Sequence, residues 1–325
     1  MLIEDQHYKN KSIMVSVLGA PNVGKSSLIN YLLGMDLSVV TNKPQTTRNR
    51  YHCIFTVDHT EVVLVDTPGL HKSNQELNKR LNQQARESVD GADLNLLLID
   101  LTEPILKQIT DFASLMEGQL GPTILVFTKS DAISDLDKLP LDEVYEKALE
   151  VLPSLIKYFT ISSKEGKDIH LLTGDICDLA QPGKHLYPDG SVSNKNMRFF
   201  ATEYIREQAF TLLKDEIPYE VAVVIDDYKD FEADDVPGKG AASHISASIL
   251  VNRPSQRAIV IGSKGSMIKE IGTRSRKKIE SMTGADVHLN LHVKVSPKWF
   301  KNNFVLEELG LPRAKDSNRV WRAKN

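Results

Sequence analysis

Gly19-Ala20-Pro21-Asn22-Val23-Gly24-Lys25-Ser26 decides which fold to expect, because it fits the pattern G-x-x-x-x-G-K-[ST]. Residues 13–18 before it are apolar and predict a buried strand, and residues 28–33 after it show an apolar stripe at helical spacing. A loop in this setting wraps nucleotide phosphates with backbone N–H groups. Lys25 would reach the terminal phosphates, and the Ser26 hydroxyl would ligate Mg²⁺. A Gly/Pro turn that happens to precede a helix is the alternative.

Composition restricts the class of protein. The 325 residues suffice for two domains, and 41% hydrophobic with 26% charged residues is typical of a globular protein. The net charge of −3 means that any nucleic-acid-binding surface must be local. Two cysteines, Cys53 and Cys177, argue against a disulfide framework. Residues 1–11 lack the apolar core of a signal peptide, and no apolar run is long enough to cross a membrane. We therefore expect a cytoplasmic location.

Four further apolar runs predict strands of one sheet. They occupy residues 62–65, 94–99, 123–127 and 158–161, with helix-length segments between them. Strands this hydrophobic indicate a mostly parallel sheet that is covered on both faces. Ligands bind beyond the carboxyl ends of such strands, and polar clusters follow three of these runs there. The first half of the chain is therefore predicted to be an α/β P-loop domain.

The polar clusters suggest which nucleotide is bound. Asp66 follows a strand and could hold Mg²⁺, while Gly69 lets its N–H approach a γ-phosphate without a Cβ in the way. An ordinary turn is the alternative for these residues. A carboxylate such as Asp131, in Thr128-Lys129-Ser130-Asp131, can accept from the ring N–H and the exocyclic amine of guanine. The sequence therefore favours guanine over adenine.

Together the motifs carry a family resemblance. The chain has segments that resemble the five motifs of the translation-factor-related GTPases, at residues 19–26, 45–48, 66–70, 128–131 and 162–164. The residues within these motifs look most like those of the Era family. The resemblance implies that Thr46 or Thr47 closes on Mg²⁺ and the γ-phosphate, with Thr47 favoured. The chain departs from the family at Thr128, where Asn is usual, and at Ser163, where Ala is commoner.

Hydrolysis is expected to be slow. Leu70 occupies the place where many GTPases carry a water-orienting Gln, and leucine cannot form a hydrogen bond to water. In related GTPases an Asn at the place of Asn22 helps to ligate K⁺, so potassium stimulation is a hypothesis here. His71 could act as a base, but a solvent-facing loop residue is the favoured interpretation.

These arguments give a set of expected site residues. Lys25, Thr47, Gly69 and Asn22 are expected to support catalysis, and Ser26, Thr47 and Asp66 to hold the metal. The expected GTP-binding residues are Gly19, Ala20, Pro21, Asn22, Val23, Gly24, Lys25, Ser26, Ser27, Asp66, Thr67, Pro68, Gly69, Leu70, Thr128, Lys129, Ser130, Asp131, Ser162, Ser163 and Lys164. The expected cofactors are GTP or GDP with Mg²⁺, and K⁺ is a candidate.

The chain changes character after the first domain. We expect a GTPase domain at 1–180, a linker at 181–197, a second domain at 198–310 and a basic tail at 311–325. The linker is rich in Pro, Gly and Ser and shows no apolar periodicity.

The second domain is predicted to be α+β. A helix is expected at 199–213, then strands at 220–225, 242–251 and 257–261, a glycine loop, and a final strand at 287–295. The loop, Gly262-Ser263-Lys264-Gly265, lets a nucleic-acid backbone approach the main chain, although an ordinary glycine turn is the alternative.

The surroundings of the glycine loop favour RNA. Residues 253–278 hold eight basic side chains and one acidic one, Glu270. The segment resembles the KH signature, and the order of elements resembles the bacterial type of KH domain, which implies single-stranded RNA as the partner. The acidic run 226–235 is expected to form a solvated hairpin tip away from the RNA. The expected RNA-binding residues are Arg257, Ile261, Gly262, Ser263, Lys264, Gly265, Lys269, Arg274 and Lys277.

The family resemblance implies a function. It points to a GTP-hydrolysing switch that binds the 3′ end of 16S rRNA and acts in assembly of the 30S ribosomal subunit, as a monomer with peripheral membrane association. An RNA-binding regulator that uses GTP as a structural ligand is the alternative, since Leu70 predicts weak hydrolysis. A GTPase that modifies tRNA or remodels membranes is a third reading, against which the KH signature counts.

Overall fold

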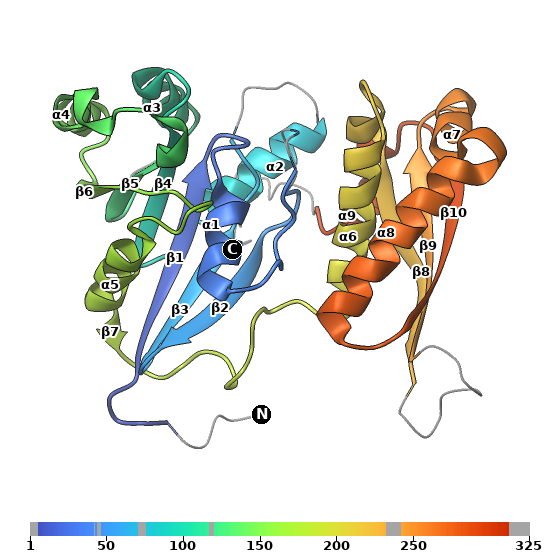
Figure 1. Ribbon diagram of the computed structural model, residues 1–325, viewed down its shortest axis with the longest axis horizontal. Helices are drawn as coiled ribbons and strands as arrows, with labels where there is room; N and C mark the ends of the chain where they lie inside the picture. Colours follow the sequence, from blue (N-terminus) through green and yellow to red (C-terminus); the bar gives the residue numbers. More distant parts are fainter. Residues whose placement is uncertain are drawn as a thin grey trace, which may run out of the picture.

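The computed structural model describes residues 6–311, apart from residues 42, 44–46, 71–75, 117–119 and 232–241. Two domains lie side by side, joined by an irregular loop over residues 183–196 (Figure 1). The first domain contains β1 (Lys11–Gly19), α1 (Lys25–Leu33), β2 (Tyr51–Val57), β3 (Thr60–Asp66), α2 (Glu76–Glu87), β4 (Leu94–Asp100), α3 (Ile105–Leu115), β5 (Thr123–Thr128), α4 (Leu141–Val151), β6 (Leu155–Thr160) and α5 (Ile169–Leu179).

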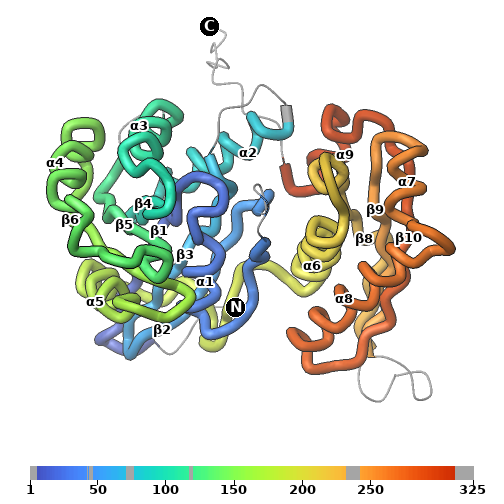
Figure 2. Tube along the Cα trace, turned by 45° about the horizontal axis from the view of Figure 1, so that its top comes forward, coloured from blue at the N-terminus to red at the C-terminus, as the bar shows by residue number. Residues whose placement is uncertain are grey.

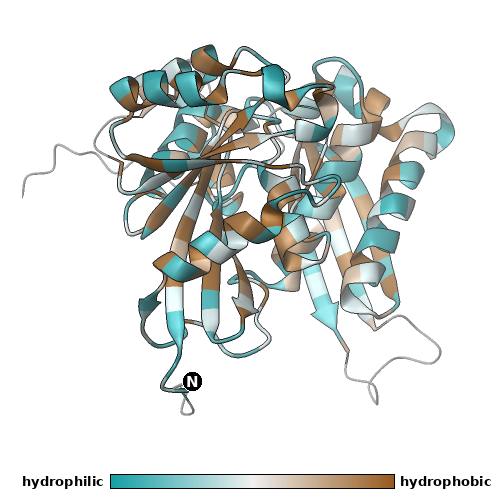
Figure 3. Cartoon of the chain, turned by 60° about the vertical axis from the view of Figure 1, so that its left-hand side comes forward, coloured by the Kyte–Doolittle hydropathy of each residue, from teal (hydrophilic) through white to brown (hydrophobic). Residues whose placement is uncertain are grey.

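The first sheet has the predicted parallel core. Its strand order is β2-β3-β1-β4-β5-β6, in which β3, β1, β4, β5 and β6 run parallel and β2 pairs antiparallel with β3. Buried residues of α1 and α5 pack on one face, and those of α2, α3 and α4 on the other. Hydrophobic residues accordingly concentrate on the strands between the helix layers (Figure 3). The edge strand β2 was not predicted.

The segment between the domains is more ordered than its composition suggested. Its first residues form β7 (Gln181–Pro182), which pairs antiparallel with the start of β1. Further along, the N–H of Leu186 donates to Glu61 at 2.6 Å, and the N–H of Ile54 donates to the carbonyl oxygen of Val192 at 3.0 Å. The linker therefore runs along the first sheet rather than spanning solvent.

The second domain has a three-stranded sheet that packs against two long helices on one face and, over part of the other face, against a short C-terminal helix. It contains α6 (Met197–Leu212), β8 (Ala222–Asp230), β9 (Ser243–Val251), α7 (Pro254–Ile261), α8 (Ser266–Thr283), β10 (Val287–Val295) and α9 (Asn303–Glu308). The strand order is β10-β9-β8, with β8 and β9 antiparallel and β9 and β10 parallel. Helix α6 faces the first domain (Figures 1 and 2).

The strand predicted at 257–261 is wrong, because these residues belong to helix α7. The β-branched run Ile259-Val260-Ile261 suggested a strand, but Pro254 stands in the first turn, where proline favours a helix start. The side chain of Gln256 also accepts the N–H of Arg253 at 3.1 Å, which caps that start. Local capping therefore outweighed β propensity.

The acidic run also differs from its prediction. Its first five residues continue β8 to Asp230 instead of forming a hairpin tip. Asp226 accepts a hydrogen bond from Ser248 at 2.5 Å and pairs with Lys294 at 2.9 Å. Although β8 and β10 are opposite edges of the sheet, Asp226 reaches across β9 to Lys294 of β10, so this part of the run contacts that strand. Most of the rest of the run, and the tail from residue 312, lie outside the described residues.

Candidate functional site

The phosphate-binding loop has the backbone that its glycines permit. Gly19 (φ 139°) and Gly24 (φ 97°) both adopt positive φ, and a Cβ on Gly19 would lie 2.6 Å from the carbonyl oxygen of Leu98. The Nζ of Lys25 donates to the carbonyl oxygens of Gly19 and Ala20 at 3.1 and 2.8 Å. Burial lowers the pKa of Lys25 to about 8, against the opposing effect of Asp66. The lysine is thus held inside the loop beside a carboxylate.

Three oxygen-bearing side chains meet beside Lys25. The hydroxyls of Ser26 and Thr47 are 3.3 Å apart, and Thr46 lies outside the described residues. Both carboxylate oxygens of Asp66 are buried and accept no hydrogen bond from the described residues. Burial raises the pKa of Asp66 to about 6, although Lys25 opposes the shift. Two hydroxyls and an unsatisfied carboxylate fit Mg²⁺, which prefers oxygen ligands.

The segment that follows Asp66 packs against the phosphate loop. A Cβ on Gly69 would lie 2.6 Å from the backbone nitrogen of Pro21, so only glycine fits there. The N–H of Leu70 donates to the carbonyl oxygen of Gly19 at 3.3 Å. The Leu70 side chain is 4% exposed and packs with Leu18 in the core. It is therefore turned away from the phosphates, and His71 lies outside the described residues.

The predicted guanine-binding residues come together at the ends of β5 and β6. Asp131 accepts a hydrogen bond from the Ser162 hydroxyl at 2.7 Å, and Lys164 lies 3.8 Å from the same carboxylate. The Thr128 hydroxyl donates to the carbonyl oxygen of Val23 at 2.7 Å, which ties β5 to the phosphate loop. Lys129 pairs with Asp100 at 2.5 Å. Thr128 stands where the family usually has Asn, and its hydroxyl holds β5 against the phosphate loop.

A cavity of about 270 Å³ links these parts. It extends from the phosphate loop to Lys129, and all four residues expected to support catalysis line it. Its lining residues are Pro21, Asn22, Gly24, Lys25, Ser26, Ser27, Val39, Val40, Thr41, Thr47, Gly69 and Lys129.

The second domain carries a groove between α8 and the free edge of β10. It is lined by apolar residues, among them Ile268 and Leu291, and by two cations, Lys269 and Arg276. The glycine loop lies at the start of α8, where Gly262 has φ 73° and a Cβ on it would lie 2.7 Å from the Cβ of Met267. An apolar groove with a basic rim beside such a loop fits single-stranded nucleic acid.

The structure sorts the expected RNA-binding residues. Lys269 lines the groove, and Lys264 is exposed in the adjoining loop. Arg274 is exposed but pairs with Glu270, and neither it nor Lys277 is among the groove-lining residues. Arg276 lines the groove and was missed, although its spacing of seven from Lys269 on one helix was a usable signal. Arg257, Ile261, Ser263 and Gly265 lie on α7 or in the glycine loop before α8.

Comparison with known proteins assigns both domains. Residues 14–129 match the family model described as "50S ribosome-binding GTPase", and residues 216–300 match the KH domain model. The chain is 35% identical over 302 residues to GTPase Era of Thermotoga maritima, an alignment that covers 93% of this chain and 97% of that protein. The chain belongs to the Era family of GTPases. GTPase Era of Geobacter sp. strain M21 is 37% identical over 305 residues, 93% of this chain and 98% of that protein.

Solved Era structures match in fold as well. One is Era in complex with MgGDPNP and nucleotides 1506–1542 of 16S ribosomal RNA, with TM-score 0.82 and 30% identity over 94% of this chain and all of that chain. Another is Aquifex aeolicus Era bound to GDP and AlF₄⁻, also with TM-score 0.82 and 30% identity, which covers 93% of this chain. The predicted order of a GTPase domain and a KH domain is therefore confirmed.

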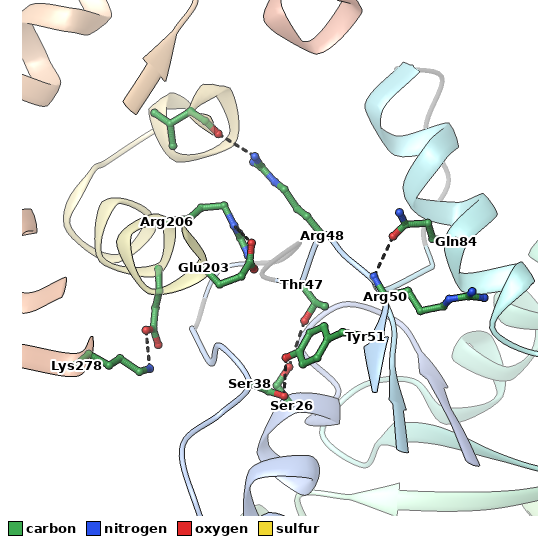
Figure 4. Close-up of polar contacts among 12 residues, drawn as sticks. Ser26, Ser38, Thr47, Arg48, Arg50, Tyr51, Gln84, Glu203, Arg206 and Lys278 are labelled. Atoms are coloured by element: carbon green, nitrogen blue, oxygen red, sulfur yellow. Dashed lines mark hydrogen bonds and ion pairs between the residues drawn. The ribbon is translucent and has the colours of Figure 1, made fainter. Parts of the chain in front are cut away.

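In this Era-family chain, the segment that carries Thr47 also contacts the KH domain. The Nη1 of Arg48 donates to the carbonyl oxygen of Val221 at 2.8 Å (Figure 4). The Nζ of Lys43 donates to the carbonyl oxygens of Phe210 and Leu213, both at 2.5 Å, near the C-terminal end of α6. The C-terminal end of a helix carries a partial negative charge, so a cation is stabilised there. Sequence reasoning missed both contacts.

Helix α2, which follows the Asp66–Leu70 motif, contacts the same domain. Its Arg80 donates to the carbonyl oxygen of Leu311 at 2.6 Å and to Asn303 at 2.5 Å. Its Leu77 and Leu81 belong to an apolar cluster with Trp299 and other buried residues of the KH domain. Both segments next to the γ-phosphate position therefore reach the RNA-binding domain.

Proposed function

We propose that this protein is a GTP-hydrolysing switch that binds the 3′-end region of 16S rRNA and couples its nucleotide state to assembly of the small ribosomal subunit. One observation carries the proposal: a single chain joins a GTPase site to a basic KH groove, in the arrangement of Era bound to MgGDPNP and a 16S rRNA fragment. In this proposal Ser26, Thr47 and Asp66 hold Mg²⁺ and Asp131 selects guanine.

The contacts between the domains offer a path for the coupling. When a γ-phosphate and Mg²⁺ hold Thr47 beside Ser26, the adjacent Arg48 is held with it, and Arg48 is bound to the KH domain backbone. The movement of Gly69 is passed on in the same way through α2 and Arg80. Because binding linkage is reciprocal, RNA that favours one domain arrangement changes GTP affinity by the same factor that GTP changes RNA affinity.

Binding of a single-stranded RNA with the 3′-terminal 16S sequence tests this function. We expect its affinity for the full-length protein to differ between the GDP and the non-hydrolysable GTP-analogue states. Replacing both Lys264 and Lys269 with Glu should abolish RNA binding but preserve GTP hydrolysis in the absence of RNA. Lys107→Glu on α3, an equally exposed lysine far from the groove, is the matched control. Unchanged RNA affinity in the double variant would show that the groove is not the RNA-binding site.

We further propose that K⁺ supplies part of the charge stabilisation during hydrolysis. Leu70 is buried in the core and offers no group to the attacking water, whereas Asn22 lines the phosphate cavity. A cation held beside the β- and γ-phosphates would offset developing negative charge. Turnover should be faster in K⁺ than in Na⁺, and Asn22→Ala should remove the difference; equal rates in the two salts for the unaltered protein would contradict the idea.

Hydrolysis is favoured over the alternative in which GTP is only a structural ligand, since the chain belongs to a family of GTPases. Action on the 30S subunit, a monomeric state, a cytoplasmic location and peripheral membrane contact remain proposals. Within the described part of the chain, no helix is long and apolar enough to cross a membrane.

A further inference from the structure

A second cavity lies between the two domains, apart from both the nucleotide cavity and the RNA groove. Its volume is about 290 Å³. Its walls come from the segment after Thr47, from the linker, from α6 and β8, and from residues 308–311. Close to its walls, Tyr51 of β2 packs against Phe199 and Phe200 of α6, with ring centroids 5.3 and 5.9 Å apart. The cavity therefore belongs to the contact that holds the domains together.

The charged residues of this interdomain cavity are mostly cations. Five basic residues line it (Arg48, Arg50, Lys195, Arg198 and Arg206), against two acidic ones, Glu203 and Glu308. Arg206 forms a buried ion pair with Glu203. Arg48, Arg50 and Arg198 instead donate to the backbone carbonyl oxygens of Val221, Glu87 and Ile225. Carbonyl oxygens orient a guanidinium but do not neutralise its charge, so the cavity keeps an excess of positive charge.

Arg48 shows this excess most clearly. Its side chain is 5% exposed, and it lies over the rings of Phe210 and Trp299 with centroid distances of 5.9 and 5.8 Å. Two of its nitrogens donate to backbone carbonyls, but its buried Nε has no hydrogen-bond partner among the described residues. Burial, with the neighbouring Arg206, lowers the pKa of Arg48 to about 9, although Glu203 opposes the shift. A buried guanidinium whose charge is only partly compensated favours an anion in the adjoining cavity.

We propose that the interdomain cavity binds a phosphate-bearing anion, with Arg48 as its buried anchor and Lys195 and Arg198 at its exposed side. Guanidinium groups match phosphate oxygens with paired, charge-assisted hydrogen bonds. The volume is near the lower limit for small-molecule pockets, which suits a short oligophosphate or one phosphate of a longer strand better than a whole nucleotide. A bound anion would join the Thr47 segment, the linker and the KH domain, and so favour the docked arrangement.

The proposal does not depend on the RNA groove, and it is tested with the full-length protein saturated with GDP and excess Mg²⁺, so that the phosphate loop is filled. Inorganic tripolyphosphate is the probe, and isothermal titration calorimetry measures its affinity and stoichiometry. We expect one site per chain. Lys195→Gln and Arg198→Gln should each weaken binding about tenfold, and Arg48→Gln should abolish it. Lys107→Gln, the same charge change on an exposed part of α3, should leave it unchanged.

Lys195 and Arg198 are exposed, so their variants are expected to fold even if Arg48→Gln does not. Titrating the 3′-terminal RNA in saturating tripolyphosphate then distinguishes the sources of phosphate. Competition that disappears in Lys195→Gln would support an RNA phosphate as the occupant, and unaffected RNA binding would support a free oligophosphate. The proposal is overturned if the unaltered protein binds no tripolyphosphate, or if Lys195→Gln and Lys107→Gln bind it equally well.

Discussion

The hydroxyl oxygens of Ser26 and Thr47 lie 3.3 Å apart, although 21 positions separate the two residues in the sequence. Ser26 lies at the end of the phosphate loop, in the first turn of α1. Thr47 directly precedes Arg48, whose side chain binds the KH domain. A ligand that holds both hydroxyls therefore acts on both domains through one short piece of chain.

Thr47→Val should weaken binding of a non-hydrolysable GTP analogue in Mg²⁺ by about tenfold, since it replaces a hydroxyl that is expected to bind the metal with a methyl group of similar size. GDP affinity should change less, because Thr47 is expected to act at the γ-phosphate. Equilibrium titration with fluorescent analogues measures both. Thr110→Val on α3, whose hydroxyl bonds only its own helix, is the control. Equal loss for GDP and the GTP analogue would contradict the role assigned to Thr47.

Gly69→Ala should lower the rate of GTP hydrolysis by about a hundredfold, because the new methyl group would push apart two segments that must approach the γ-phosphate together. Gly174→Ala on α5 is the control, since its new methyl group meets nothing within 4 Å. It should leave turnover unchanged and raise the free energy of unfolding by roughly 0.5–1 kcal/mol. Single-turnover phosphate release and urea unfolding check the pair. Full activity in Gly69→Ala would show that the contact with Pro21 is dispensable.

Arg276→Gln should weaken RNA binding several-fold and reduce its salt dependence by about one counterion. Arg274→Gln on the same helix should have a smaller effect, because both arginines pair with a glutamate on α8 but only Arg276 lines the groove. Filter binding at several salt concentrations compares the two variants. If Arg274→Gln proves the more damaging, the RNA lies on a different face of α8 from the one inferred.

Ser162→Ala should lower guanine-nucleotide affinity by roughly 1 kcal/mol, because the lost hydroxyl orients the Asp131 carboxylate from 2.7 Å. Ser114→Ala on α3, where the hydroxyl bonds a neighbouring carbonyl, is the control. Competition between GTP and ATP analogues also tests selectivity, which should fall with the Ser162 change. Unaltered GTP affinity would mean that Asp131 keeps its position without this bond.

The sequence predicted those features that depend on local pattern. Three of the parallel strands are continuous apolar runs, so β3, β4 and β5 were found close to their true bounds, whereas β6 begins three residues before its predicted start because exposed residues interrupt it. The chemistry of the nucleotide site was predictable for the same reason, since its residues are contiguous motifs. Thr47 was favoured over Thr46 from the family resemblance alone, and the structure places Thr47 beside Ser26.

Features that depend on tertiary contacts were not predictable. The edge strand β2 was missed because part of it faces solvent and its sequence is not a continuous apolar run. Helix α7 was missed because its β-branched residues suggested a strand. The roles of Lys43 and Arg48 depend on backbone carbonyl oxygens about 170 residues away, and any residue type provides such an acceptor. No motif encodes a contact of that kind.

The burial of Leu70 has an evolutionary consequence. A single substitution to Gln would not supply a water-orienting amide, because the new side chain would enter the core beside Leu18 and bury polar atoms without partners. Faster intrinsic hydrolysis through this position would need a different backbone conformation at residue 70 as well as a different side chain. Selection can therefore adjust the lifetime of the GTP state more easily through binding partners than through a substitution at this position.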